Sequence, residues 1–351
     1  MAVTKYFTRL GDGEGIWMSK EEIREDVMAG INDAVTKGKA PHLTDDDVEK
    51  LIEILTMPEK NVSVERGNEG VMTFDAGTLK LPIRAGIPMD RMTALMTHER
   101  VLCSDTMEMC NVDYSYKALK NIVSEEAMAM ELAQKNCILP IFYGAMPNVG
   151  QYTKPDGPLD NWSELLPKGE VKEAMAAQEE AVELASKDMI FVGTHLADAG
   201  ACGIQFDTCG ASGDADILAA LIASKELSAK YPDLSIEMGM ANEFHLGMHG
   251  KLKFEGQRLA GQFPAQQVKS VEAAGAHIYG CVINTKSSKS FPWNLARSIA
   301  YVKSAVEVAD IPVVVNAGMG VGGIPLSNTA PTDATTRASK ALIEIGKADG
   351  L

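Results

Sequence analysis

The sequence predicts an α/β fold built on a parallel sheet, and three observations predict it. Over residues 96–351, short apolar runs typical of strands alternate with amphipathic segments typical of helices, and the later repeats span roughly 30 to 45 residues, the size of a strand–helix unit. The strand-like runs are continuously apolar, as expected where helices cover a parallel sheet. Most of them end in a polar residue followed by a glycine-containing loop. These features favour a TIM-type (β/α)8 barrel over a doubly wound sheet, whose polar loops gather near one switch point.

Length and composition are those of a soluble globular protein. The chain has 351 residues, of which 46% are hydrophobic and 23% are charged. Because no apolar run approaches the roughly 20 residues of a membrane span and the N-terminal stretch lacks a signal-peptide pattern, we expect a cytoplasmic protein with no membrane partner. The formal net charge of -15 argues against nucleic-acid binding, which needs basic patches. None of the six cysteines forms a CxxC pair, which argues against zinc-ribbon and thioredoxin-like sites.

Residues 1–95 are predicted to form an N-terminal extension made of a hairpin and helices. The stretches KYFTRL and GIWM flank the glycine-rich turn GDGEG, a pattern typical of a hairpin. Ser19 then caps a helix, and Glu22, three residues later, completes a capping box. Thr44 caps a second helix, TDDDVEKLIEILTM, and Pro58 lies just beyond its end.

The barrel domain is predicted to occupy residues 96–351. Its expected strands are 138–144, 202–210, 234–242, 277–284 and 311–318, with a weaker candidate at 100–106. Its expected helices are 171–200, 214–231, 264–275, 294–309 and 336–346. Leu351 follows a helix and a turn, in the place where another strand is expected to begin. We therefore expect an incomplete barrel that lacks its last strands, with its open edges covered by oligomerisation or with a mobile C-terminal region.

Polar residues follow or end most of the predicted strands, where the chemistry of such a barrel lies. They include Tyr143, Asp207, Glu237, Glu243, Asn284 and Asn316. Glu237 stands within the otherwise apolar strand SIEMGM, where a carboxylate is costly unless it is paired, protonated or in contact with a ligand. It either pairs with a neighbouring barrel residue or belongs to the site, where a raised pKa would suit proton exchange with an amine.

Three other motifs leave alternatives open. His245 and His249 have a spacing that allows a metal site, but neighbouring glycines weaken a helix there and no HExxH is present. The stretch NAGMGVGGIP could cradle a phosphate or simply let the backbone pass close to another group. Lys286 and Lys289 could act as nucleophiles if they were buried.

A set of longer stretches, taken together, resembles one family. These stretches are MTHERVLCSDTMEM, FYGAMPNVGQYTKPDGP, FDTCGASGDAD, IEMGMANEFHLGMHG, NTKSSKSFPWNLAR, and NAGMGVGGIPL followed by TRASKALIEI. In them the chain resembles the dimethylamine:corrinoid methyltransferases of methylotrophic methanogens, barrel enzymes that belong with the monomethylamine methyltransferases. The resemblance implies transfer of a methyl group from dimethylamine to the Co(I) corrinoid of a cognate corrinoid protein, in methanogenesis from methylamines.

The resemblance also implies which cofactors and partners take part. No cofactor is expected to be bound permanently, because the corrinoid is supplied by the partner protein. The family's distinguishing residue is pyrrolysine, encoded by an in-frame amber codon, whose ring imine is thought to add the amine and hold it in front of cobalt. In relatives this residue follows the segment that here ends at Leu351. Termination at the amber codon or a deliberate truncation would give this chain, which we expect to be inactive and homo-oligomeric.

The expected roles of the strand-end residues follow from this chemistry. An amine is a poor leaving group and must become cationic, or be held as an adduct, before a nucleophilic metal can remove its methyl group. Carboxylates can move the protons and offset the positive charge. The residues expected to handle protons are Glu237, Glu243 and Asp207, and those expected to orient the substrate are Tyr143, Asn284 and Asn316.

Other functions remain open from the sequence. A lyase or aldolase on a small barrel could use Lys286 or Lys289 as a Schiff base. The chain could instead be a non-catalytic truncation product that binds the corrinoid protein. A zinc enzyme with His245 and His249 as ligands is a further alternative.

Overall fold

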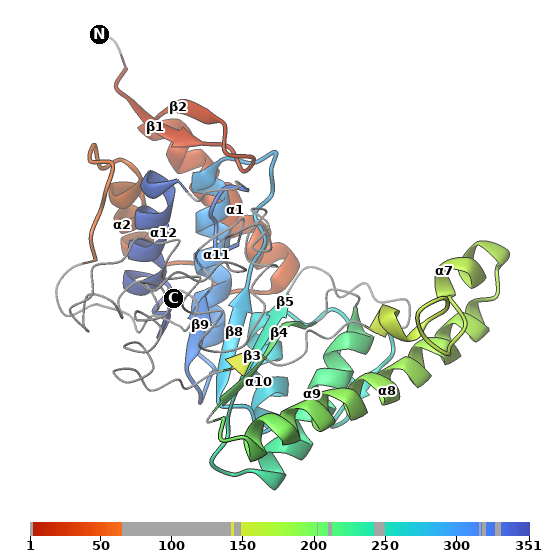
Figure 1. The fold of residues 1–351 in the computed structure, drawn as a ribbon. Helices are drawn as coiled ribbons and strands as arrows, with labels where there is room; N and C mark the ends of the chain where they lie inside the picture. The colour runs from red at the N-terminus through yellow and green to blue at the C-terminus, as the bar shows by residue number, and fades with distance from the viewer. Residues whose placement is uncertain are drawn as a thin grey trace, which may run out of the picture. The chain divides into compact units, whose positions relative to one another are not determined.

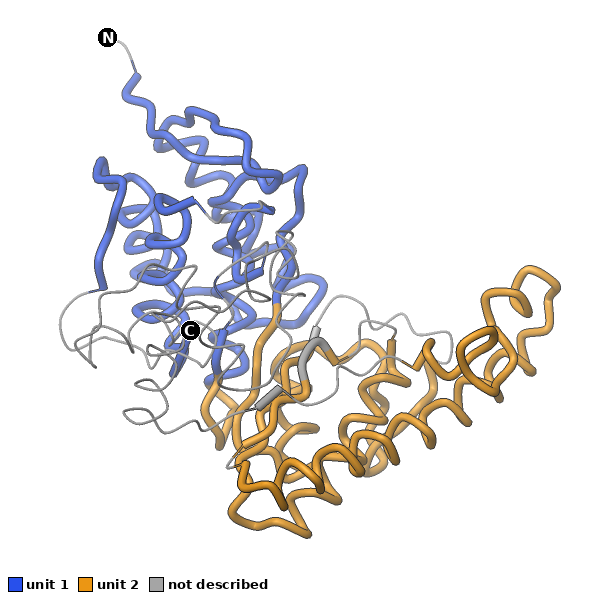
Figure 2. Tube along the Cα trace, viewed as in Figure 1, with its two compact units in different colours: residues 1–142, 283–306, 314–351 blue, residues 143–282, 307–313 orange. Residues whose placement is uncertain are grey.

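The structure is a computed structural model, and it describes most of the chain outside one long central segment. The described residues are 3–64, 142–143, 149–201, 203–209, 213–241, 250–315, 317, 321–326 and 331–351. The chain divides into two compact units (Figure 2). Unit 1 contains residues 1–142, 283–306 and 314–351, and unit 2 contains residues 143–282 and 307–313. The predicted domain boundary at residue 95 and the predicted strand 100–106 lie outside the described residues.

Unit 2 is built on parallel strands (Figure 1). Strand β4 (Gly203–Cys209) pairs with β5 (Ser235–Ala241), and β5 pairs with β8 (Ile278–Val282), both in parallel. The complete strand order is β3-β4-β5-β8-β9, with β3 at Phe142–Tyr143 and β9 at Val313–Val315. The predicted α/β fold with a parallel sheet is therefore confirmed, while closure into a (β/α)8 barrel stays a prediction.

The register of these strands gives the sheet two different faces. Side chains alternate along a strand, and the pairing places Ile204, Ile236, Met238 and Tyr279 on one face. All four are buried, and the Tyr279 hydroxyl donates to Gln267 Oε1 on helix α10 at 2.7 Å. Burial of each large apolar side chain contributes about 2 kcal/mol. This apolar face is the one that packs against helices.

Long helices accompany the strands of unit 2. They are α8 (Val171–Asp198), α9 (Asp214–Lys230) and α10 (Pro264–Ala273), and their bounds lie close to the predicted ones. Shorter elements not predicted from the sequence are η4 (Val149–Tyr152), α7 (Trp162–Leu165), η5 (Leu166–Lys168), and the small hairpin of β6 (Lys253–Phe254) and β7 (Gln257–Arg258). Among the helices that the structure describes, none combines the length and apolar composition that crossing a bilayer would require.

Unit 1 joins the N-terminal segment to the last helices of the chain. Strands β1 (Lys5–Arg9) and β2 (Gly15–Ser19) form the predicted antiparallel hairpin. The helices described in this unit are α1 (Lys20–Gly38), α2 (Asp45–Leu55), α11 (Phe291–Val306) and α12 (Thr332–Glu344). Helix α1 packs along α11, and α2 packs along α12 (Figure 1).

The helix starts in unit 1 follow the capping chemistry of the sequence. Ser19 Oγ accepts from the Glu22 amide at 3.2 Å, and the Glu22 carboxylate accepts from the Ser19 amide at 2.6 Å. This confirms the predicted capping box. Thr44 forms a second box with Asp47, so both helices satisfy amides that would otherwise lack a partner.

The last residues of the chain pair with strand β9. Gly350 forms a parallel bridge with Val314, and the Val315 amide donates to the Gly350 carbonyl at 3.1 Å. The backbone at Gly350 therefore pairs in parallel with β9 at the place where the sequence predicts a further strand.

Close packing of α1 on α11 generates a stability prediction at Gly30. An Ala Cβ at this position would lie 2.2 Å from the Trp293 carbonyl oxygen, which is backbone and cannot rotate away. Alanine gains about 1 kcal/mol in helix propensity over glycine, but such overpacking costs about 1–3 kcal/mol. We expect Gly30→Ala to lower the urea midpoint of unfolding. The control Thr36→Ala, at an exposed position of α1, should leave it equal or higher, and a raised midpoint for Gly30→Ala would contradict the contact.

Candidate functional site

Glu237 is buried in the middle of strand β5. Only 5% of its surface is exposed, and the strand around it is apolar. Its neighbour across the parallel ladder is Gln205 of β4, whose Nε2 donates to Glu237 Oε1 at 3.3 Å. The pair lies on the opposite face of the sheet from Tyr279 and Met238, because side chains alternate along each strand.

The face that carries Glu237 differs in composition from the helix-covered one. By the strand register, Gln205 and Glu237 share it with Gly239 and Gly280, which face each other in β5 and β8. A Cβ at Gly280 would lie 2.8 Å from Gly239 Cα, so glycine allows the two strands to approach closely there, and an amide and a carboxylate supply polar groups beside this contact. A buried carboxylate with this setting can hold a cationic group or exchange a proton with one.

The other predicted site residues are only partly described. Asp207 and Tyr143 belong to β4 and β3 as expected, but their side chains lie outside the described part of the structure. Glu243 and Asn316 lie outside it entirely. Asn284 belongs to unit 1, is half-buried, and forms an antiparallel bridge with Val321. The contact partner that the structure gives to Glu237 is thus Gln205, which sequence reasoning did not single out.

Two buried aspartates at the start of α9 were also missed from the sequence. Asp214 and Asp216 are fully buried in the first turn of the helix. Asp216 Oδ1 accepts from the Val149 amide at 3.0 Å, and Asp214 Oδ2 accepts from the Leu252 amide at 3.3 Å. Asp216 therefore connects the segment after β3 to helix α9, and Asp214 connects the segment after β5 to the same helix. The signal in the sequence was the acidic pair in GDAD at a helix start, where carboxylates are stabilised.

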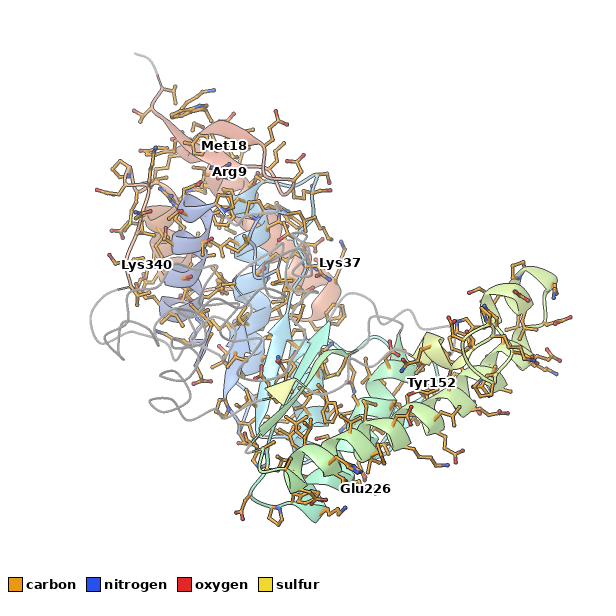
Figure 3. All side chains as sticks on the ribbon, viewed as in Figure 1. Arg9, Met18, Lys37, Tyr152, Glu226 and Lys340 are labelled. Carbon is orange, nitrogen blue, oxygen red and sulfur yellow. The ribbon has the colours of Figure 1, made fainter. Side chains whose placement is uncertain are left out.

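A cluster of charged groups surrounds Lys286 in unit 1, in the loop that follows β8. Asp33 on α1 accepts from Lys37 at 2.5 Å and from Arg297 Nε at 2.9 Å, and Lys286 Nζ lies 3.7 Å from the same carboxylate. Lys37 is labelled in Figure 3. Lys286 Nζ also lies 5.2 Å from the centre of the Trp293 ring, and Arg297 lies 5.8 Å from it. The cluster therefore holds more positive than negative charge.

The loop that carries Lys286 is held in place by one side chain. Asn294 is almost fully buried, and its Oδ1 accepts from the Lys286 amide at 2.8 Å. Its Nδ2 lies within hydrogen-bond distance of the carbonyls of Lys286, Lys289 and Ser290, at 3.1, 3.2 and 2.9 Å. The side chain therefore fixes the backbone on both sides of the turn.

The electrostatics of this cluster shift two pKa values in the same direction. Burial lowers the pKa of Lys286; the Asp33 carboxylate opposes that effect and the charge of Lys37 adds to it. Burial raises the pKa of Asp33, but hydrogen bonds from Lys37 and Arg297, together with the charge of Lys286, outweigh it and hold this pKa below its usual range.

A reactive thiol and a metal centre are two further kinds of site that the described side chains could form. The Cys281 thiol is buried on the helix-covered face, and burial raises its pKa to about 12, so it does not supply a thiolate near neutral pH. No group of three or more potential ligands able to hold a metal ion occurs within the described residues. His245 and His249, the candidate zinc ligands, lie outside them.

Comparison with known proteins shows which family this parallel-sheet protein with a buried carboxylate belongs to. A family model described as dimethylamine methyltransferase matches residues 4–351. The chain belongs to the dimethylamine methyltransferase family. The matched residues of this dimethylamine methyltransferase family member span both compact units. The match confirms the resemblance found in the sequence. No solved structure matches the chain.

The charged cluster generates a pH-dependent prediction at Asp33. Because its pKa is lowered in the folded state, its contribution to stability is present above its unfolded pKa of about 3.9 and is lost as pH falls through the folded pKa. Near pH 7, Asp33→Asn should lower the free energy of unfolding by about 2 kcal/mol, because Arg297 loses its charged partner.

The measurement is urea unfolding of both proteins between about pH 7 and pH 3. The difference between the wild type and Asp33→Asn should shrink as the pH falls. Asp156→Asn, at an exposed position of unit 2, is the matched control and should change little at any pH. A gap for Asp33→Asn that stays constant across this range would contradict the electrostatic account.

Proposed function

We propose that this family member, in its pyrrolysine-containing form, transfers a methyl group from dimethylamine to the Co(I) corrinoid of a cognate corrinoid protein, leaving monomethylamine. Membership of the dimethylamine methyltransferase family supports the reaction class. The observation that carries the proposal is the burial of Glu237, beside Gln205, on the face of the parallel sheet opposite Met238 and Tyr279. Corrinoid acts here as the methyl acceptor.

The proposed role of Glu237 follows from its surroundings. The methyl group is removed from an amine readily only when the nitrogen carries positive charge, since a neutral amine would have to leave as a strongly basic amide anion. A carboxylate in a desolvated position interacts more strongly with such a cation than an exposed one does. Glu237 would balance this charge and exchange the proton, while Gln205 Nε2 fixes the carboxylate through its hydrogen bond.

The remaining assignments are extensions of the same proposal. Glu243 and Asp207 would share proton handling with Glu237, and Tyr143, Asn284 and Asn316 would orient the amine. A pyrrolysine, the distinguishing residue of the family that the sequence resembles, would supply through its imine the electrophile that holds the amine. The sheet would be completed as a (β/α)8 barrel in the active protein, which we propose to be a homo-oligomer. The buried carboxylate of Glu237 suits the cation that such an electrophile would produce.

Replacing the Glu237 carboxylate tests its role directly. In the pyrrolysine-containing protein, Glu237→Gln should lower dimethylamine-dependent methylation of the Co(I) corrinoid protein by about 100-fold or more, because proton transfer and charge balance are both lost. The shape is conserved, so the circular dichroism spectrum and urea midpoint should stay near wild type.

Glu226→Gln is the matched control, since Glu226 is an exposed residue of α9 (Figure 3). It should retain full activity. Wild-type turnover in a folded Glu237→Gln variant would refute the assignment, whereas absence of methylation in the wild-type protein would refute the proposed reaction itself.

A second candidate function has one observation in its favour. Burial lowers the pKa of Lys286, and a lysine with a lowered pKa is a better nucleophile for a Schiff-base lyase or aldolase. Its position 3.7 Å from Asp33 and close to Lys37 argues for a structural role instead.

Borohydride trapping separates the two candidates. The chain is incubated with a small aldehyde or ketone, reduced, and analysed by peptide mass spectrometry. We expect no selective adduct at Lys286 compared with the exposed Lys253, because the Lys286 side chain is only partly exposed and lies 3.7 Å from the Asp33 carboxylate. Selective trapping at Lys286 would favour the lyase.

A further inference from the structure

A groove of about 950 Å³ lies on unit 1, apart from the Glu237 face of the sheet. Its walls include residues 4–7, 57–61 and 331–333. These three segments are the start of the hairpin, the chain that follows α2, and the start of α12. The Arg9 side chain, labelled in Figure 3, also lines it.

The hairpin presents the edge of strand β1 to this groove. Successive side chains of a strand point to opposite faces, so a run of consecutive lining residues indicates the edge rather than one face. Among the strands that the structure describes, β1 pairs only with β2. The outer edge of β1 therefore offers backbone donors and acceptors of the kind that bind a further strand.

Positive charge predominates along the groove. Its lining contains the cationic residues Lys5, Arg9, Lys60 and Arg337, and the acidic residues Glu59 and Asp333. Arg9 is neutralised by Asp333, to which its Nη2 donates at 2.9 Å. Lys5 and Lys60 are exposed. This excess of positive charge stands out in a chain whose formal net charge is -15.

Arg337 adds a charge that no carboxylate of the described residues pairs directly. It is 7% exposed, and its guanidinium donates to the backbone carbonyls of Met57 at 2.6 Å, Glu59 at 2.8 Å and Asp333 at 2.9 Å. Within the described part of the chain, its Nε has no hydrogen-bond partner. A buried cation with this environment favours an anion placed nearby.

Exposed aromatic side chains complete the groove. Trp17 is 62% exposed and Phe7 38% exposed, and they face each other across the hairpin with ring centres 5.6 Å apart. Arg9 lies 5.1 Å from the centre of the Phe7 ring. Large aromatic surfaces next to cationic groups are typical of places where proteins bind other chains.

We propose that this groove binds an extended, acidic peptide segment of a partner protein, which adds to the outer edge of β1 as a third strand. The backbone of β1 supplies the hydrogen bonds, Lys5 and Lys60 pair with carboxylates of the segment, and an apolar side chain of the segment packs on Trp17. This site is separate from the proposed methyl transfer and does not depend on it.

The test uses a blocked hexapeptide of alternating valine and glutamate, with the full chain at low salt. Isothermal titration calorimetry and the fluorescence of Trp17, the most exposed of the three tryptophans, report binding. We expect saturable binding that weakens in about 0.5 M NaCl. The double variant Lys5→Glu with Lys60→Glu should lose about tenfold or more in affinity, whereas Lys253→Glu, an exposed lysine on strand β6, should bind as wild type.

Other outcomes would overturn the proposal. Equal binding of a hexapeptide of alternating valine and lysine would show that charge does not select the ligand. Equal competition by free glutarate or inorganic phosphate would indicate a simple anion site without strand addition. A dimer of this chain in light scattering that dissociates in the double variant would assign the groove to a second copy. No binding of the acidic hexapeptide to a folded wild-type chain would also refute it.

Discussion

The parallel pairing of β5 between β4 and β8 is the constraint on which the candidate site depends. Because side chains alternate along each strand, the register that buries Met238 against the helices also turns Glu237 to the opposite face. A shift by one residue would place the carboxylate among apolar side chains and turn the methionines to the opposite face. The same interactions that stabilise the helix-covered face therefore hold Glu237 beside Gln205, and the site needs no separate scaffold.

Much of the fold could be predicted from local signals in the sequence. The capping pairs that begin at Ser19 and Thr44 and the continuous apolar runs of the parallel strands depend on neighbours in the chain, and the structure contains both. Contacts between distant segments were not predictable in this way. Nothing near Glu237 in the sequence indicates Gln205, and nothing near Asp216 indicates the Val149 amide, because each pairing forms only when the strands and loops assemble. Its place within an otherwise apolar strand identified Glu237 as a costly buried carboxylate, but it could not assign its partner.

Cationic side chains hold the N-terminal segment to the last third of the chain. Arg9 pairs with Asp333, Arg297 pairs with Asp33, and Arg337 donates to carbonyls beyond the end of α2. Each of these contacts links residues more than 260 positions apart, so they join segments of unit 1 that are distant in the sequence. Arginine suits these contacts because its planar guanidinium carries several N–H donors that can satisfy several acceptors at once.

Asn294 gives the loop after β8 an unusual mechanical property. Its amide and carbonyl hold the backbone at Lys286 and Lys289, and its own backbone belongs to α11. The hairpin turn docks on the same loop, where the Gly11 amide donates to the Lys289 carbonyl at 2.7 Å and a Cβ at Gly11 would meet the Lys286 carbonyl. These contacts connect the loop, the hairpin turn and α11 to one another. A displacement of α11 along its axis would therefore carry both lysines with it. Hydrogen bonds from the helix on one side and from the hairpin turn on the other thus hold the backbone of this loop in place.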